Sequence, residues 1–452
     1  METINKRFVG FICLVSALGG LLFGYDWVVI GGAKPFYEIY FGIADNPSLQ
    51  GLAISIAIAG CLLGAMTAGW LADKCGRKRL LIISAVIFLL SAYATGAFNT
   101  FDLFLAARFL GGIAIGIASG LSPMYIAEIS PVSMRGRLVS VNQLTIVLGI
   151  LGAQIANMLI AHPMPEGTTV PSADSWNCLM GWRWMFWGEA FPAAAFMILV
   201  FFIPESPRWL ALAGRKREAI DVLKKIGGSA YAMDEIAAAE YYNPDETSAK
   251  SGLKTLFSKK YAKVLILGIF IAVFQQWCGT NVIFNYAQEI FADAGFDLGD
   301  MLFNIVLTGI TNVIFTIVAI FTVDRIGRRP LMLWGAGGLA VIYLILGTCY
   351  LFHVKGIFMI LLVVAAIACY AMTLGPITWV LIAELFPDKV RAVAVAVCTF
   401  ALWTGCLTLT YSFPLLNSSL GSYGTFWIYS GICFFGLIYL SKSLHETKGK
   451  RI

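Results

Sequence analysis

The sequence Phe274-Gln-Gln-Trp-Cys-Gly-Thr-Asn281 places three amide side chains near the middle of a long apolar segment. The apolar run 264–273 precedes it and the run 282–284 follows it, so the whole segment is long enough to cross a bilayer. Adjacent glutamines on a helix point about 100° apart and cannot both be buried in one helix contact. An amide in hydrocarbon without a partner is costly. We therefore expect this segment to line a water-filled cavity at mid-membrane depth.

The polar groups of this segment suit a neutral ligand. Gln and Asn side chains carry both donors and an acceptor, as a sugar hydroxyl does. Gly279 loosens the helix, and Asn281 and Asn285 then lie one turn apart. The pattern favours binding of a sugar or polyol. The alternative is that the amides only tie neighbouring helices together by hydrogen bonds.

The composition is that of a polytopic membrane protein. Hydrophobic residues make up 59% of the 452 residues and charged residues 13%, against about 25% in ordinary soluble domains. The first apolar run continues to about Gly32, which is too far for a cleavable signal. The basic residues behind the net charge of +6 are dispersed over short loops, which does not indicate nucleic-acid binding. The histidines fall in loops or tails and the cysteines lack ligand spacing, so we expect no metal site, no cofactor and no enzymatic centre.

Twelve segments are candidates for membrane spans, because each crossing needs about 20 predominantly apolar residues. The expected fold is therefore an all-α polytopic membrane protein with twelve transmembrane helices. The expected spans are about 8–32, 51–72, 80–98, 102–123, 138–161, 184–203, 262–290, 302–323, 331–351, 356–382, 392–414 and 424–441.

The basic residues report the topology of these spans. Of the 32 Lys and Arg residues, we expect only Lys34, Arg183 and Lys355 on the side opposite the N-terminus, and Arg108 within a span. By the positive-inside rule, both termini are then cytoplasmic. An odd number of spans would mix the two sides, so this segregation supports twelve.

Three motifs occur twice, in the same order, and divide the chain into similar halves. Such a repeat predicts two pseudo-symmetric bundles of six helices with a binding site between them, as in transporters that work by alternating access. The pairs are Asp73–Arg79 with Asp324–Arg329, Glu128–Arg135 with Glu384–Arg391, and Pro204–Arg208 with His445–Lys448.

The longest segment without an expected span separates the two halves. Within it, Arg215–Ile226 and Met233–Tyr242 have the pattern of short amphipathic helices. We expect an N-terminal six-helix bundle over 1–203, a cytoplasmic linker over 204–262, and a C-terminal six-helix bundle with a short tail over 263–452.

These motifs resemble the sugar porter family of the major facilitator superfamily over nearly the whole chain. Within that family the pattern is similar to bacterial proton-coupled sugar symporters of the xylose type. The resemblance implies the major facilitator fold and transport of a monosaccharide, and a monomer is the default state of this fold. The matching pieces are Gly24-Tyr25-Asp26, Asp73–Lys78, Arg108–Gly112, Glu128–Arg137, Pro204–Leu210, Gln275-Gln276, Asp324–Arg329 and Glu446–Gly449.

The resemblance also implies which residues contact the sugar. Trp379 follows Gly375-Pro376, a helix-breaking sequence, and its ring would pack on the C–H face of a sugar. Taken alone, Trp379 would be equally well explained as a core or interface aromatic residue, and Gln143 would be better explained by a buried hydrogen bond between helices. Two positions depart from the family pattern. Position 402 is often polar in close relatives and is Leu402 here, and position 371 is Glu in many glucose facilitators and is Ala371 here. The implied contacts are Gln143, Gln275, Gln276, Asn281, Asn312 and Trp379, with Trp403 as an aromatic residue near the site.

Asp26 is a carboxylate well inside the first expected span. An isolated Asp at a helix centre costs about 2.5–3.5 kcal/mol even on the lenient insertion scale. Arg108, in the fourth span, is its expected partner. A cycle that separates and rejoins the two would bind and release a proton at Asp26, since burial and the Arg act on it in opposite directions. In the resembling family an Asp at this position accompanies proton symport; the alternative is a static ion pair.

The repeated loop motifs carry charges that can form an ion-pair network at the cytoplasmic ends of the helices. Exposed pairs contribute only about 0–1 kcal/mol each. Several together can still bias two states that differ by a few kcal/mol. We expect this network to hold the outward-facing state, the alternative being that the basic residues only set topology. Its members are Asp73, Arg77, Glu128, Arg135, Asp324, Arg328, Glu384 and Arg391.

The expected function is import of a monosaccharide, a pentose such as D-xylose or a hexose, coupled to a proton across the cell inner (plasma) membrane. The partners are then the sugar, the proton and the lipid bilayer. The alternatives are a facilitative sugar or polyol uniporter and, less favoured, a sugar receptor, because such receptors usually carry long cytoplasmic extensions. Xylose, glucose, galactose, arabinose and inositol carriers share most of these residues, so the choice of sugar stays open.

Overall fold

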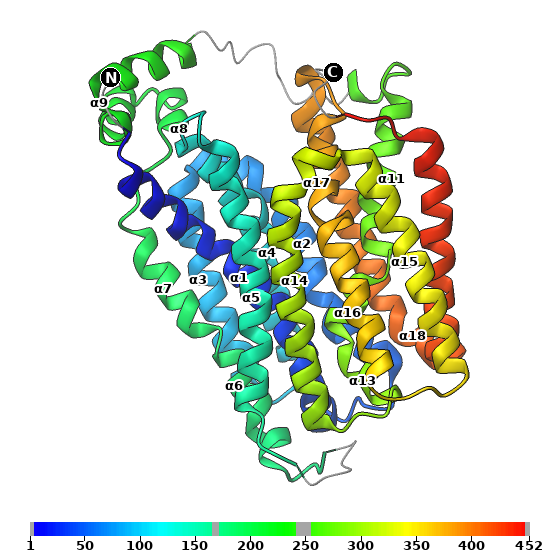
Figure 1. The fold of residues 1–452 in the computed structure, drawn as a ribbon. Coiled ribbons are helices and arrows are strands. Elements are labelled where there is room, and N and C mark those ends of the chain that lie inside the picture. The colour runs from blue at the N-terminus through cyan, green and yellow to red at the C-terminus, as the bar shows by residue number, and fades with distance from the viewer. Residues whose placement is uncertain (1–3, 165–170, 241–254, 448–452) are drawn as a thin grey trace.

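The computed structural model describes residues 4–164, 171–240 and 255–447, and these residues fold into a bundle of long helices (Figure 1). Two parts of the expected pattern lie outside the described residues: Tyr241 and Tyr242 at the end of the second linker helix, and Lys448-Gly449 of the C-terminal motif. The side chain of Asp324 also lies outside them.

The first half of the chain consists of long helices that pack closely through small residues. Gly60 and Gly112 lie where α2 and α4 cross, and a Cβ atom at Gly112 would overlap the carbonyl of Ala57. Gly24 and Gly149 play the same part where α1 meets α5. Small residues allow this approach in a membrane, where packing rather than the hydrophobic effect drives helix association. The elements are α1 (Lys6–Tyr40), α2 (Pro47–Cys75), α3 (Arg77–Ala97), α4 (Phe101–Ile129), α5 (Arg135–Ile160), η1 (Asn177–Gly181), α6 (Trp182–Trp187) and α7 (Ala190–Val200).

The linker between the halves contains α8 (Pro207–Leu212) and α9 (Lys216–Glu240). Gly228 has φ of 83° and interrupts α9, so α9 is two short helices, as the amphipathic pattern predicted. The first of these two helices lies against the start of the chain, where the backbone N–H of Asn5 donates to the backbone carbonyl of Ile226 at 2.8 Å.

The second half repeats the first but its helices are broken more often. Gly279, with φ of 88°, separates α11 from α12. Thr373 separates α16 from α17, and Gly421, with φ of 69°, bends α18. The elements are α11 (Ala262–Trp277), α12 (Thr280–Asn285), α13 (Ala287–Asp293), α14 (Leu298–Ile326), α15 (Arg328–Leu351), α16 (Ile357–Met372), α17 (Leu374–Glu384) and α18 (Asp388–Ser443).

These helices give the twelve expected crossings. Ten described helical segments are long and apolar enough to span a membrane. One of them is the 51-residue segment Val393–Ser443, which Gly421 divides into two crossings. The remaining crossing consists of α6 and α7, which follow one another and are each too short to be counted alone. The expected fold class, two six-helix bundles in an all-α membrane protein, is confirmed.

The expected first span was too short. It ended at 32, whereas α1 continues to Tyr40 and includes Lys34 and Glu38. These charged residues remain helical and buried because they pair with each other at 3.0 Å. Charge alone was therefore a poor signal for the end of this helix.

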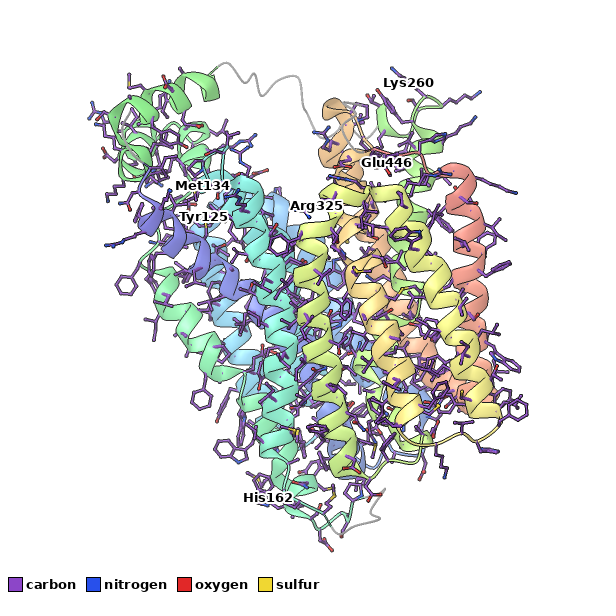
Figure 2. All side chains as sticks on the ribbon, viewed as in Figure 1. Tyr125, Met134, His162, Lys260, Arg325 and Glu446 are labelled. Carbon is purple, nitrogen blue, oxygen red and sulfur yellow. The ribbon has the colours of Figure 1, made fainter. Side chains whose placement is uncertain are left out.

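The two bundles stand side by side and meet along two seams (Figure 1). At one seam α5 packs against α14, and at the other α2 packs against α18. Both termini lie at one end of the molecule, together with α8 and α9. Figure 2 places Tyr125, Arg325 and Glu446 toward that end and His162 at the opposite end.

Candidate functional site

A cavity of about 520 Å³ lies between the two bundles. Helices α1, α4 and α5 of the first bundle and α11, α12, α14, α16, α17 and α18 of the second contribute to its wall. Its volume falls in the range of about 300–1,000 Å³ that is usual for small-molecule sites. All seven residues expected at the sugar site line this one cavity: Gln143, Gln275, Gln276, Asn281, Asn312, Trp379 and Trp403.

The amides of the central stretch form a chain of hydrogen bonds along the cavity wall. Asn281 donates to the Gln276 carbonyl oxygen, and Gln276 donates to that of Gln275 at 2.5 Å. Gln275 in turn donates to the hydroxyl of Tyr370. Each amide is thus oriented by the next, and the chain still borders open space. The expected cavity beside these amides is present.

Breaks in two helices bring the polar residues to the cavity. Gly279 adopts the left-handed conformation, and a Cβ atom there would lie 2.9 Å from the ring of Tyr429, so no larger residue fits. This break starts α12 and points Asn281 at the cavity in the first turn. The break at Thr373 starts α17, whose Trp379 lines the wall and is 41% exposed. The predicted helix break near Gly375-Pro376 is therefore found, just before the glycine.

Aromatic side chains form the wall on the α1 and α18 side. The ring of Trp403 lies 5.8 Å from that of Trp27 and 6.0 Å from that of Phe23, between centroids. Sequence reasoning missed Trp27, Phe23 and Tyr370. The only signal for Trp27 was its place next to Asp26. Leu402 also lines the cavity, so this part of the wall is apolar, as the departure from the family pattern suggested.

Asp26 and Arg108 form the expected ion pair between α1 and α4. The Arg108 Nη1 donates to Asp26 Oδ1, and its Nη2 reaches the Asp26 backbone oxygen at 3.4 Å. Each residue is only 2% exposed. Neither lines the large cavity; the pair lies behind Trp27, which does.

A second buried carboxylate, Glu189, accompanies this pair. It lies between α6 and α7, is 2% exposed, and its Oε1 has no hydrogen-bond partner among the described residues. The charges of Asp26 and Arg108 both act on it. Sequence reasoning overlooked Glu189 inside the expected span 184–203, although the signal, a lone acid in an apolar run, was the one that identified Asp26.

The chain matches a known protein family over nearly its whole length. The family model described as "Sugar (and other) transporter" matches residues 12–452. The chain belongs to the sugar transporter family. It is 34% identical to the arabinose-proton symporter of Bacillus subtilis, with 98% of this chain and 94% of the relative covered. It is also 34% identical to the D-xylose-proton symporter of Escherichia coli, with 99% and 95% covered.

The fold of this sugar transporter is also that of a solved relative. An inward-open structure of the xylose transporter of Escherichia coli is 33% identical and superposes with a TM-score of 0.86, covering 98% of both chains. The predicted family, and with it a transporter rather than an enzyme, is confirmed.

At the end that holds the termini, each bundle of the transporter carries the same charged cluster. In the first bundle Arg77 Nη2 lies 3.0 Å from Glu128 Oε1 and its Nη1 lies 3.1 Å from Asp73. In the second, Arg328 Nη2 lies 3.0 Å from Glu384 Oε1. These ion pairs each join residues of one bundle. Arg135 is exposed at the start of α5, and Arg391 Nε donates to the Phe386 carbonyl at 3.1 Å.

The sequence repeat extends to the contacts of these clusters. Glu205 accepts the backbone amides of Arg77 and Lys78, at 2.9 and 3.0 Å. Glu446 accepts those of Arg328 and Arg329, at 3.0 and 3.1 Å. The hydroxyl of Ser206 donates to Glu128, and that of Thr447 to Glu384. The motifs that end the two halves, Pro204–Arg208 and the one that begins at His445, therefore bind the loop motifs of their own bundles. The sequence alone did not predict this role.

The opposite end of the transporter is held closed by a contact between the bundles. Lys34 of α1 forms an ion pair with Glu289 of α13 and a second with Glu38. Lys34 is only 1% exposed and lies within α1, beyond the expected end of the first span at 32. In contrast, the cavity extends toward the termini, where Val323 and Arg328 are part of its wall.

Proposed function

We propose that this chain imports a monosaccharide, a pentose such as D-xylose or a hexose, together with a proton, by alternating access. The observation that carries the proposal is the set of seven residues from both bundles on one cavity. The relatives named as arabinose-proton and D-xylose-proton symporters support both the substrate class and the coupling.

The sugar site is proposed to combine oriented amides with aromatic surfaces. Gln275, Gln276 and Asn281 already share hydrogen bonds, so little conformational freedom is lost when a sugar binds them. Gln143 and Asn312 face them from α5 and α14 across the same cavity. Trp379 and Trp403 offer ring faces to the C–H groups of the sugar.

Proton coupling is proposed to reside in Asp26, Arg108 and Glu189. Two carboxylates and one guanidinium are buried together, which leaves one negative charge without a matching cation if both acids are ionised. A buried unpaired charge is costly, so one acid is expected to hold a proton whenever the site is closed. Asp26 contacts Arg108 and is proposed to bind the coupled proton when the conformational change separates the two residues.

The charged clusters near the termini are proposed to hold the opposite conformation. Here the cavity extends toward the termini while Lys34 and Glu289 close the other end. When that end opens, the two clusters approach one another across the bundle interface. The residues proposed to form this contact are Asp73, Arg77, Glu128, Arg135, Asp324, Arg328, Glu384 and Arg391.

The end with both termini is proposed to face the cytoplasm of a cell inner (plasma) membrane, with the chain acting as a monomer. Basic residues such as Lys260 and Arg325 lie toward this end (Figure 2), which fits the positive-inside rule. The proposed units are a bundle over 1–203, a cytoplasmic linker over 204–262 and a bundle over 263–452. A reporter enzyme fused to the C-terminus tests the orientation, since it is expected to be shielded from external protease in intact cells.

Uptake by proteoliposomes tests the function. Radiolabelled pentoses and hexoses are supplied with an inward proton gradient, with and without a protonophore. We expect accumulation of at least one of these sugars above its external concentration, and loss of that accumulation with the protonophore. Equilibration without accumulation would instead establish the facilitative uniporter, and no uptake of any sugar would refute the proposal.

A further inference from the structure

A second, much smaller cavity shares Trp27 with the sugar cavity as part of its wall. Its volume is about 10 Å³. Most of its wall is apolar and comes from α1, α2 and α4, and its two polar wall residues are Arg108 of α4 and Asn285 of α12. Trp27 lines both cavities and separates them.

The two polar residues present complementary, unpaired atoms. Arg108 Nε is buried and has no hydrogen-bond partner in the described part of the chain, and the same holds for Asn285 Oδ1. The first is a donor and the second an acceptor. Arg108 is 2% exposed and Asn285 is 1% exposed, so bulk water reaches neither. A buried polar atom without a partner is costly, which makes a bridging molecule favourable here.

We propose that this cavity binds one water molecule that bridges Arg108 Nε and Asn285 Oδ1, and that Asn285 positions Arg108 through it. A cavity of roughly 10–15 Å³ suffices for a single water, provided that polar partners are present. The water accepts a hydrogen bond from the guanidinium and donates one to the amide oxygen. The bridge joins the second bundle to the coupling pair of the first.

The position of Asn285 links this bridge to the sugar. Helix α12 runs only from Thr280 to Asn285 and follows the left-handed Gly279. Its first turn carries Asn281, which lines the sugar cavity, and its last residue is Asn285. Helix α12 is thus a short rigid element with the sugar at one end and Arg108 at the other.

Helix α1 packs so closely against α12 that a small shift of α12 affects α1. A Cβ atom at Gly31 of α1 would lie 2.8 Å from the Phe284 carbonyl oxygen and 3.2 Å from that of Asn285. Because α1 also carries Asp26, a shift of α12 changes both partners of Arg108. This inference rests on the proposed function, and it assigns to Asn285 the transmission of sugar binding to the coupling pair.

Four variants in proteoliposomes test the inference, with sugar-induced proton uptake and sugar counterflow measured on each. Asn285→Leu removes the acceptor, and Ala57→Val fills the cavity without touching either polar group. We expect both to lower the ratio of protons to sugar about ten-fold, the effect of one lost hydrogen bond to a charged group. Counterflow, which needs no net proton movement, is expected to stay within about two-fold of wild type.

Two further variants separate positioning from a merely structural role. Asn285→Gln keeps an amide oxygen that can reach the guanidinium, so it is expected to restore the ratio. Ile115→Val enlarges the cavity and keeps both polar atoms, so it is expected to behave as wild type. If Asn285→Leu does not insert or fold, Ala57→Val decides the question.

Three results would overturn the inference: a wild-type ratio in Ala57→Val, a wild-type ratio in Asn285→Leu, or an equal loss of counterflow and proton uptake in both. Failure of the proposed function is recognised separately, because the wild-type protein would then show no sugar-induced proton uptake at all.

Discussion

The two bundles share one sequence pattern but divide the chemistry between them. The first has long unbroken helices from α1 to α5 and buries charges: Asp26, Arg108 and Glu189. The second breaks its helices at Gly279, Thr373 and Gly421 and presents uncharged amides to the cavity. The one interruption of a span in the first bundle, between α6 and α7, is where Glu189 lies.

This difference shows how two bundles with the same repeated motifs can be specialised, one for the proton and the other for the sugar. A buried ion pair needs fixed partners, which continuous helices supply by close packing around small residues such as Gly111. A sugar site needs groups that converge on a cavity, and breaks in the helices turn polar residues toward it. The following experiments test this division, in order of decreasing expected effect.

Removing the charge of Asp26 should have the largest effect. Asp26→Asn keeps the shape and eliminates the titrating group, so sugar-induced proton uptake and accumulation should be lost, while counterflow remains. Proton uptake by proteoliposomes after sugar addition measures this. If this variant still takes up protons as the wild type does, Asp26 is not the coupling site. Glu189 would then be tested next with Glu189→Gln.

Removing an amide of the second bundle should affect the sugar and leave coupling intact. Gln276→Ala deletes the centre of the amide chain and should weaken sugar binding by about 1–3 kcal/mol, roughly five- to 150-fold. Sugar titration by isothermal calorimetry in detergent measures the dissociation constant. Gln50→Ala, outside the cavity, is the control and should change it little. Unchanged binding in Gln276→Ala would remove the central stretch from the sugar site.

Removing the hydroxyl of Tyr370 should have a smaller effect of the same kind. Tyr370→Phe leaves the ring in place but frees Gln275 to rotate its amide. The expected loss is about 0.5–1.5 kcal/mol of binding, the net contribution of one neutral hydrogen bond. Competition by a panel of pentoses and hexoses shows whether sugar preference also changes. Equal affinity and preference in the variant would mean that the hydroxyl does not orient the amides.

The smallest effects should come from substitutions in the charged clusters near the termini, which have the same contacts in both bundles. Glu205→Gln and Glu446→Gln remove equivalent carboxylates, each of which accepts the backbone amides of the two basic residues that follow the loop glycine. Glu205 also accepts the backbone amide of Ser206 at 2.8 Å. Each should lower transport by a few-fold, corresponding to about 1 kcal/mol, and the two should agree within about two-fold. Initial rates of uptake measure both. A large difference between them would show that the bundles use these clusters differently.

The sequence was sufficient for the fold and for seven residues of the cavity wall. Apolar length and the alternation of basic loops predicted twelve crossings, and the repeated motifs predicted two bundles. The seven expected sugar contacts meet on one cavity because each lies at a polar or aromatic position inside an apolar span. The extent of α1 was missed, because a helix can continue through Lys34 and Glu38 when they pair with each other and Lys34 also pairs with Glu289 of α13.

Contacts between distant segments were beyond a reading of the sequence. Tyr370 resembles any aromatic residue in a span until its hydroxyl is seen to accept from Gln275. Asn285 follows Asn281 by one turn, yet the two line different cavities, because α12 passes between the sugar site and Arg108. Glu189 could have been identified from its apolar surroundings, but its neighbours Asp26 and Arg108 come from two other helices.

The ion pair of Lys34 with Glu289 has a kinetic consequence. While that end is closed, Lys34 is buried and the Glu289 side chain is only 24% exposed, so dissolved salt weakens the pair little; once it opens, the same charges are hydrated and contribute only about 0–1 kcal/mol to one another. Added electrolyte, which screens charges beyond about 8–10 Å, therefore acts mainly on the open state. The turnover rate should respond to ionic strength on the face opposite the termini, whichever sugar is carried.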